Sequence, residues 1–249
     1  ISMWIADMDF KSPPAVTDAL IKTAQHGIYG YGDTDDEYDS LIVNWYEHRI
    51  NWKIEKDQIL KIPGVMFGVA AAIRAVTEPN DAVLICQPVY YPFAKIIPDN
   101  HRRTVVSALI LKNGRYEIDF EDFENKIKQE KVKVFLLCSP HNPVGRVWSR
   151  TELAEIARIC LKNGVYIISD EIHSDFIYPG YKHIPIASLS DEIADRTITC
   201  LSPTKTFNLA GLQAANMVVP NRNLRIRIKK ECAATGYSHL NIMATAATK

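Results

Sequence analysis

Short apolar segments that alternate with amphipathic helical segments constrain the fold of this chain more than any other feature. The apolar segments are rich in Val, Ile and Leu on both faces, which is typical of strands buried inside a sheet. Strands are predicted at Ala82 to Cys86, Thr104 to Ala108, Val132 to Cys138, Val165 to Ser169, Thr197 to Leu201 and Ala214 to Val219. Helices are predicted at Ala15 to Gln25, around Leu41 to Ile50, and at Val65 to Val76, Phe120 to Lys128 and Thr151 to Lys162. The alternation predicts an α/β fold with a mostly parallel sheet flanked by helices.

The composition is that of an ordinary soluble globular protein, with 47% hydrophobic and 23% charged residues. Because 29 basic residues balance 29 acidic ones, nothing indicates nucleic acid or a membrane surface as a partner. We find neither a membrane-spanning apolar run nor a signal peptide. The cysteines lack the spacing of a metal site or a disulfide framework, so reduced structural thiols in a cytoplasmic protein without a metal are predicted. They are Cys86, Cys138, Cys160, Cys200 and Cys232.

Two of the predicted strands end in unusual polar sequence, at the sheet edge where parallel α/β folds bind ligands. After Cys138 comes S-P-H-N-P-V-G-R, in which two prolines and a glycine fix a turn around Asn142. Asn142 could instead simply bond its own backbone. After Ser169 come Asp170, Glu171 and His173. This acidic pair suits a ligand site, and equally suits a solvated helix start capped by Asp170.

A lysine follows a third strand, in the sequence S-P-T-K-T-F-N-L-A-G-L that contains Lys205. A lysine at a strand end among small side chains can reach a carbonyl, as Schiff-base chemistry requires. The hydroxyls of Ser202 and Thr204 could hold a phosphate. Taken alone, a solvated lysine in a proline turn is the commoner situation, because most lysines are exposed.

Further candidate ligand groups lie near the other elements. Gly64 leads directly into a predicted helix, so the free amides of Gly64, Val65 and Met66 form a candidate phosphate site. Aromatic residues after Cys86, including Tyr90, could stack on a flat ligand or simply pack in the core. The G-x-G at Gly30 lacks the third glycine of a dinucleotide-binding fingerprint, so that kind of site is excluded.

The three strand ends together predict a pyridoxal phosphate (PLP) site. A lysine amine suits the cofactor's aldehyde, a carboxylate keeps the pyridine nitrogen protonated so that the ring accepts electrons, and an amide faces the ring oxygen. The three motifs in this order resemble the fold-type I PLP enzymes of the class I/II aminotransferase superfamily. Within it, W-I-A-D-M-D-F, H-G-I-Y-G-Y and D-E-I-H are similar to the MalY/PatB-type branch of cystathionine β-lyase-like C–S lyases.

This resemblance implies a role for each catalytic candidate. Lys205 would bind PLP covalently and later shuttle a proton, and Asp170 would pair with the pyridinium nitrogen. Asn142 would contact the ring hydroxyl, with His173 standing near it where many aminotransferases have a tyrosine. Tyr90, rather than its neighbour, would stack on the ring.

The resemblance also implies how the phosphate is bound and how the chain is organised. The phosphate-binding residues would be Gly64, Val65, Ser202 and Thr204, joined by Tyr31 from the second subunit of a homodimer. Gln213 stands where many relatives place a phosphate-binding arginine, which predicts weaker anchoring. We expect residues 1–32 to form an N-terminal segment that contributes to the active site and the dimer, and 33–249 to form the PLP-binding large domain. The small C-terminal domain, with its arginine for the substrate carboxylate, and a short N-terminal piece are expected to be missing from this chain.

The resulting functional hypothesis is a PLP-dependent C–S β-lyase. Its small-molecule amino-acid substrate would be cystathionine or a related cysteine S-conjugate, which it would split into a thiol, pyruvate and ammonia. An aminotransferase that transfers an amino group to a 2-oxo acid is the first alternative, because no residue in the sequence separates the two reactions. A PLP-binding regulatory protein is the second, although no basic helix-turn-helix segment is present.

Overall fold

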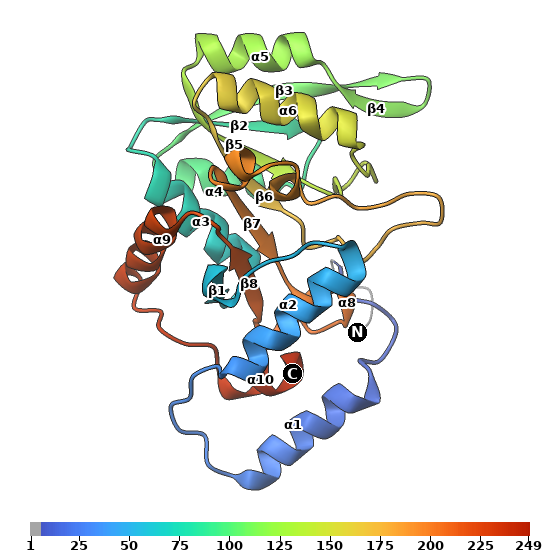
Figure 1. Ribbon diagram of the computed structural model, residues 1–249, viewed down its shortest axis with the longest axis vertical. Coiled ribbons are helices and arrows are strands. Elements are labelled where there is room, and N and C mark those ends of the chain that lie inside the picture. The colour runs from blue at the N-terminus through green and yellow to red at the C-terminus, as the bar shows by residue number, and fades with distance from the viewer. Residues whose placement is uncertain (1–5) are drawn as a thin grey trace.

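The computed structural model describes residues 6–249, in which the strands form an eight-stranded sheet in the order β1-β8-β7-β6-β5-β2-β3-β4 (Figure 1). Five central strands run parallel, and three edge or near-edge strands run antiparallel to their neighbours. The parallel strands are β2 (Ala82–Gln87), β3 (Arg103–Lys112), β5 (Val132–Cys138), β6 (Tyr166–Asp170) and β7 (Thr197–Leu201). The antiparallel strands are β1 (Ile59–Ile62), β4 (Arg115–Ile118) and β8 (Ala215–Val218). The predicted mostly parallel α/β fold is confirmed.

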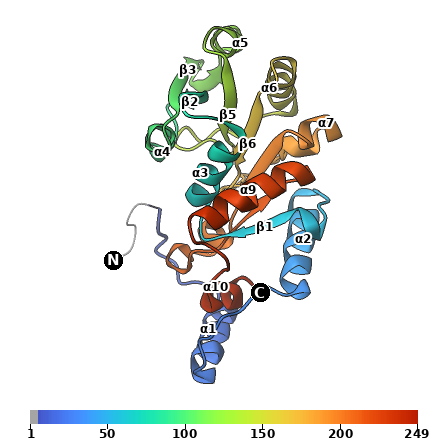
Figure 2. The same ribbon diagram turned by 90° about the vertical axis from the view of Figure 1, so that its left-hand side faces the viewer.

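Helices cover both faces of the sheet (Figure 2). On one face lie α3 (Val65–Val76), α4 (Pro92–Asp99) and α9 (Arg222–Ala234), and on the other lie α5 (Phe120–Gln129), α6 (Arg150–Lys162) and α7 (Asp191–Ala194). Successive strand residues point to opposite faces, so β2 sends Val83 and Ile85 into the first core and Leu84 into the second. This two-sided burial explains why the strands are continuous apolar runs in the sequence.

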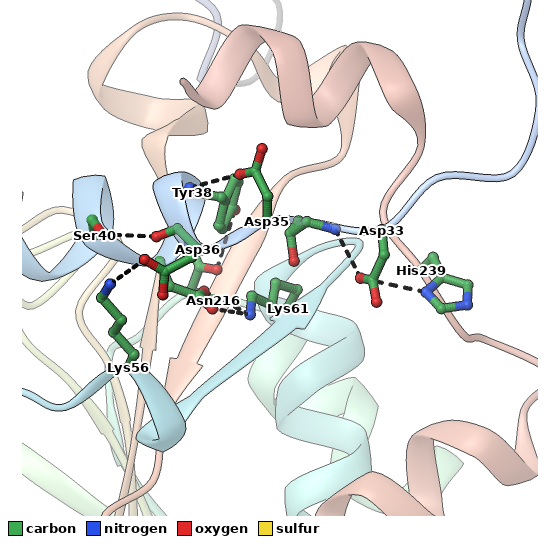
Figure 3. Close-up of polar contacts among 11 residues, drawn as sticks. Asp33, Asp35, Asp36, Tyr38, Ser40, Lys56, Lys61, Asn216 and His239 are labelled. Atoms are coloured by element: carbon green, nitrogen blue, oxygen red, sulfur yellow. Dashed lines mark hydrogen bonds and ion pairs between the residues drawn. The ribbon is translucent and has the colours of Figure 1, made fainter.

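One of the N-terminal helices lies beside the β1–β8 edge of the sheet. Here α2 (Asp36–Ile50) is capped by Asp35, whose carboxylate accepts from the Tyr38 amide at 3.0 Å (Figure 3). The buried Tyr38 hydroxyl donates to Asn216 of β8 at 3.2 Å, and Lys61 of β1 pairs with Asp39 at 2.6 Å. These contacts fix α2 on the edge of the sheet. The helix α1 (Pro14–His26) buries none of its residues and lies against α10 (Ile242–Thr248).

Segment boundaries agree with the sequence expectations to within about two residues for most of the predicted elements, while β1, β4, α4, α7, α8 (Pro203–Thr206) and α9 were not anticipated. The sequence of Met3 to Phe10 also favours an extended segment; this segment lies partly outside the described residues, and residues 6–10 form no regular element. Asn208 holds this segment, because its amide nitrogen donates to the carbonyls of Met8 and Phe10 and its side-chain oxygen accepts from the Met8 amide. Among the described residues, no helix is long and apolar enough to cross a membrane.

Candidate active site

A cavity of about 240 Å3 lies beyond the carboxyl ends of β5, β6 and β7. Most of the predicted site residues line it, together with four residues that the sequence analysis did not assign to the site. Its lining consists of Ala6, Gly64, Val65, Met66, Phe67, Tyr90, Cys138, Asn142, Asp170, Ile172, His173 and Lys205. The sheet topology therefore brings Lys205, Asp170 and Asn142 together from three separate strand ends.

Asp170 ends β6 and is only 5% exposed. One carboxylate oxygen accepts from the Ile172 amide at 3.1 Å, which orients the side chain. Burial, aided by the Glu171 carboxylate, raises the pKa of Asp170 to about 7, although the hydrogen bond from the Ile172 amide and the charge of Lys205 oppose the rise. Because few donors or positive charges offset the cost of burying this carboxylate, the site is suited to a cationic group placed in the cavity.

The sequence alternative for this segment, a solvated helix start, is wrong. Asp170 and Glu171 are both buried, and residues 172–175 form turns rather than a helix. The carboxylate of Asp170 still caps a backbone amide, as in an Asx turn, but it does so inside the protein.

Lys205 lies in the short helix α8 (Pro203–Thr206), which follows β7 directly. The segment is fixed on both sides of the lysine. Before it, the Ser202 hydroxyl accepts from the Thr204 amide at 3.0 Å and donates to the Ala214 carbonyl at 2.6 Å. After it, the Thr206 hydroxyl donates to Asp175 at 2.7 Å. Hydrogen bonds on both sides of Lys205 therefore hold its segment in place, and Lys205 lines the cavity.

The first turn of α3 supplies an anion-binding end to the cavity. Gly64 occupies the N-cap position without a side-chain cap, and Val65, Met66 and Phe67 line the cavity. Amides at a helix start have no intrahelical acceptor, and the helix dipole favours a negative charge there. Ser202 and Thr204 are not among the lining residues, and their hydroxyl oxygens lie 2.6 Å apart. Their predicted role as phosphate ligands stays a prediction.

The turn that carries Asn142 is tied to the segment that carries Tyr90. His141 donates from Nε2 to the Pro88 carbonyl at 2.9 Å, and burial lowers the pKa of His141 to about 4, so the ring is neutral near pH 7. The backbone amide of Asn142 donates to the Cys138 sulfur at 3.4 Å. Sequence reasoning assigned neither His141 nor Cys138 to the site; their position beside Asn142 in the strand-end motif is the signal that could have identified them.

Two further residues that line the cavity, Tyr90 and His173, suit a flat aromatic ligand. Tyr90 lines the cavity, whereas Tyr91 is 74% exposed and points elsewhere. Burial raises the pKa of Tyr90, aided by Tyr91 and Asp170, so its hydroxyl stays protonated. Burial also lowers the pKa of His173, with the Lys205 charge adding to the effect, so a neutral imidazole faces the cavity.

Two residues singled out in the sequence lie away from the cavity. Tyr31 is fully exposed, and Gln213 is exposed in a left-handed conformation with φ of 58°. Neither is among the residues that line the cavity. The expectation that Tyr31 serves a neighbouring subunit stays a prediction.

The residues present fit the cofactor that the sequence predicts. A lysine amine, a buried carboxylate, an amide side chain, an aromatic ring and a helix N-terminus line one cavity. No group of three metal-ligating side chains occurs within residues 6–249. A second, more open hollow of about 740 Å3 shares Ala6, Asn142 and His173 with the first, and Tyr178 and Tyr181 also line it.

Comparisons with known proteins agree with this geometry. The family model described as aminotransferase class I and II matches residues 1–248. The chain is 43% identical to cystathionine beta-lyase PatB of Bacillus subtilis over 99% of its length, and 32% identical to Protein MalY of Escherichia coli over 89%. The crystal structure of cystalysin from Treponema denticola, which contains a pyridoxal 5'-phosphate cofactor, superposes with a TM-score of 0.96 at 39% identity over the whole chain. The chain spans 64%, 56% and 63% of these three proteins.

Proposed function

Because this chain belongs to the aminotransferase class I and II family, we propose that the full-length protein is a PLP-dependent C–S β-lyase acting on cystathionine or another cysteine S-conjugate. The observation that carries the proposal is that Lys205, Asp170 and Asn142 line one cavity. The relatives named as cystathionine β-lyases favour elimination over amino transfer. The net reaction consumes the conjugate and water and yields a thiol, pyruvate and ammonia.

The residues that would hold PLP follow from the cavity. Lys205 would take its aldehyde, Asp170 would face the ring nitrogen, Asn142 and His173 the ring hydroxyl, and Tyr90 the ring face. The amides of Gly64 and Val65 would bind the phosphate, together with the hydroxyls of Ser202 and Thr204. When bound, PLP supplies the electron sink for the pair of electrons left by the departing α-proton.

The protein groups each have a definite task in this reaction. The Lys205 amine would remove the α-proton of the substrate and keep it near the reacting atoms. Asp170, oriented by the Ile172 amide, would face the ring nitrogen of PLP and stabilise a positive charge there. The second hollow, which Tyr178 lines, would give the leaving thiolate room beside the site.

We further propose that the protein works as a homodimer in the cytoplasm. Tyr31 is exposed on this chain, which suits a role in a neighbouring subunit's phosphate site. All five cysteines are unpaired, and four are buried, which suits a reducing compartment.

The test uses the full-length protein with PLP and L-cystathionine, without any 2-oxo acid. We expect pyruvate and free thiol to be released in equal amounts over many turnovers. The family match favours an aminotransferase as the second candidate. Amino transfer to a 2-oxo acid without pyruvate release would reject the lyase and establish this candidate, and cofactor binding without either activity would leave a regulatory role.

A further inference from the structure

A second carboxylate lies next to Asp170 and faces away from the cavity. Glu171 is fully buried, and its side chain is held by three donors. One oxygen accepts from the Ser169 hydroxyl at 2.9 Å and from the Ile186 amide at 3.3 Å. The other accepts from Nε2 of the buried His183 at 2.7 Å. Neither Glu171 nor His183 lines the cavity, so neither can touch a ligand there.

The backbone of Glu171 connects this buried pair to Asp170. The Glu171 amide donates to the Cys200 carbonyl of β7 at 2.9 Å, and the next amide, that of Ile172, donates to the Asp170 carboxylate at 3.1 Å. Consecutive side chains at a strand end point to opposite faces. Anchoring Glu171 on one face therefore fixes the peptide whose N–H orients Asp170 on the other.

The same pair closes the loop that follows β6. His183 lies 12 residues after Glu171, and its hydrogen bond ties the end of the loop to its beginning. Between them, His173 lines the cavity, and Asp175 accepts from the hydroxyl of Thr206, the neighbour of Lys205. One closed loop thus carries contacts to Asp170, to the cavity and to the lysine segment.

We propose that Glu171 and His183 form a positioning pair that holds Asp170 and the loop in the geometry that the cofactor requires. If the buried Glu171 carboxylate loses the His183 donor, it either stays unpaired at a cost in free energy or rearranges. A rearrangement of Glu171 would move the Ile172 amide. The inference rests on the proposed function only in naming PLP as the ligand of the cavity.

The experiment compares two variants of the full-length protein, His183→Gln and His183→Met. The glutamine keeps an N–H donor near the position of Nε2, whereas methionine fills a similar volume without one. His48→Met, at an exposed histidine of α2 that bonds only within its own helix, is the control. The readouts are the PLP dissociation constant, measured without substrate from the cofactor's absorbance, and the thermal unfolding of the PLP-free protein.

We expect His183→Met to weaken PLP binding by about tenfold, the size expected when one buried acceptor loses its donor. His183→Gln should stay within about threefold of the wild type, and the control should not change. Where lyase activity is measured, His183→Met should lower kcat more than it raises KM, because Asp170 acts after the substrate has bound.

Unchanged PLP affinity in a folded His183→Met protein, with only a lowered melting temperature, would overturn the proposal and leave the pair a purely stabilising one. If that variant does not fold, Ser169→Ala, which removes a single hydroxyl from the same carboxylate, replaces it. PLP binding weakened by about threefold supports the proposal, and unchanged binding overturns it. A wild type that binds PLP but releases no pyruvate rejects the β-lyase function alone, whereas one that binds no PLP rejects both proposals.

Discussion

The strand-end region around Asp170 and the exposed positions Tyr31 and Gln213 differ in how fully this chain fixes them. Asp170 is buried, is bonded by a neighbouring amide and is backed by the Glu171–His183 pair. Tyr31 is fully exposed, and Gln213 is exposed outside the cavity lining. The surroundings of Asp170 are therefore fixed by contacts within this chain, whereas the proposed role of Tyr31 needs a second subunit.

The largest effect in the strand-end region is expected at Lys205. Lys205→Ala should lower the rate of pyruvate release roughly 10^4-fold, because the group that attaches PLP and moves the α-proton is lost. PLP should still bind, without a covalent link, because the remaining cavity is intact. Lys182→Ala, at an exposed lysine of the loop after β6, is the matched control and should be unaffected. Substantial residual lyase activity in Lys205→Ala would reject the catalytic role proposed for Lys205.

Asp170→Asn should lower lyase turnover by roughly 10^2 to 10^3-fold, because the amide can still accept from Ile172 but cannot hold a positive charge at the ring nitrogen. The control is Asp18→Asn, an exposed aspartate of α1, which should leave turnover unchanged. Equal turnover in Asp170→Asn and the wild type would show that the carboxylate is dispensable.

The same substitution should stabilise the PLP-free protein at high pH. The pKa of Asp170 is raised from 3.8 to about 7 in the folded state, chiefly by burial, so the folded protein retains a proton that the unfolded chain has lost. Stability therefore falls as the pH rises from about 4 to 7, by up to about 4 kcal/mol, and Asn at this position escapes the loss. Urea unfolding at pH 8 and at pH 4 measures this. A stability gain that persists unchanged at pH 4 would contradict the titration.

The strand-end region is also where the sequence was most informative. Asn142, Asp170 and Lys205 could be placed together because each lies at the end of a buried parallel strand or within four residues after it, and parallel strands end at one edge of the sheet. The partners that hold them could not be placed, because they come from distant or irregular segments. His183 meets Glu171 across a loop, and Asn208 bonds residues 198 and 200 positions earlier.

How well each helix or strand could be predicted also depended on the strength of its local sequence pattern. The helix α3 was predicted residue for residue, because its apolar spacing begins after a glycine and continues without a break. The helix α4 was missed, since it begins at Pro92 and contains Pro98, and the four-residue strands β1 and β4 are too short to show a period. Local pattern thus fixes long elements, while tertiary contacts decide the short ones.

Of the two exposed positions, Tyr31 should show the larger effect. Tyr31→Ala should weaken PLP binding by about tenfold while leaving the unfolding of the PLP-free protein unchanged. The physical reason is that an exposed tyrosine contributes little to its own chain, whereas a hydroxyl that reaches a partner's phosphate contributes a charge-assisted hydrogen bond. Tyr29→Ala, an exposed tyrosine two positions earlier, is the matched control. Unchanged PLP affinity in Tyr31→Ala would remove the argument for a shared site.

The smallest effect is expected at Gln213, and it is a gain. Gln213→Arg should strengthen PLP binding a few-fold, because a guanidinium donates two hydrogen bonds and a charge to a phosphate where an amide donates at most one or two without charge. Because Gln213 is exposed, the larger side chain meets no packed core there. Gln213→Lys is the comparison, since it adds the charge without the planar pair of donors. If arginine and lysine strengthen binding equally at low salt and neither does so at high salt, only long-range attraction is at work, and Gln213 does not face the phosphate.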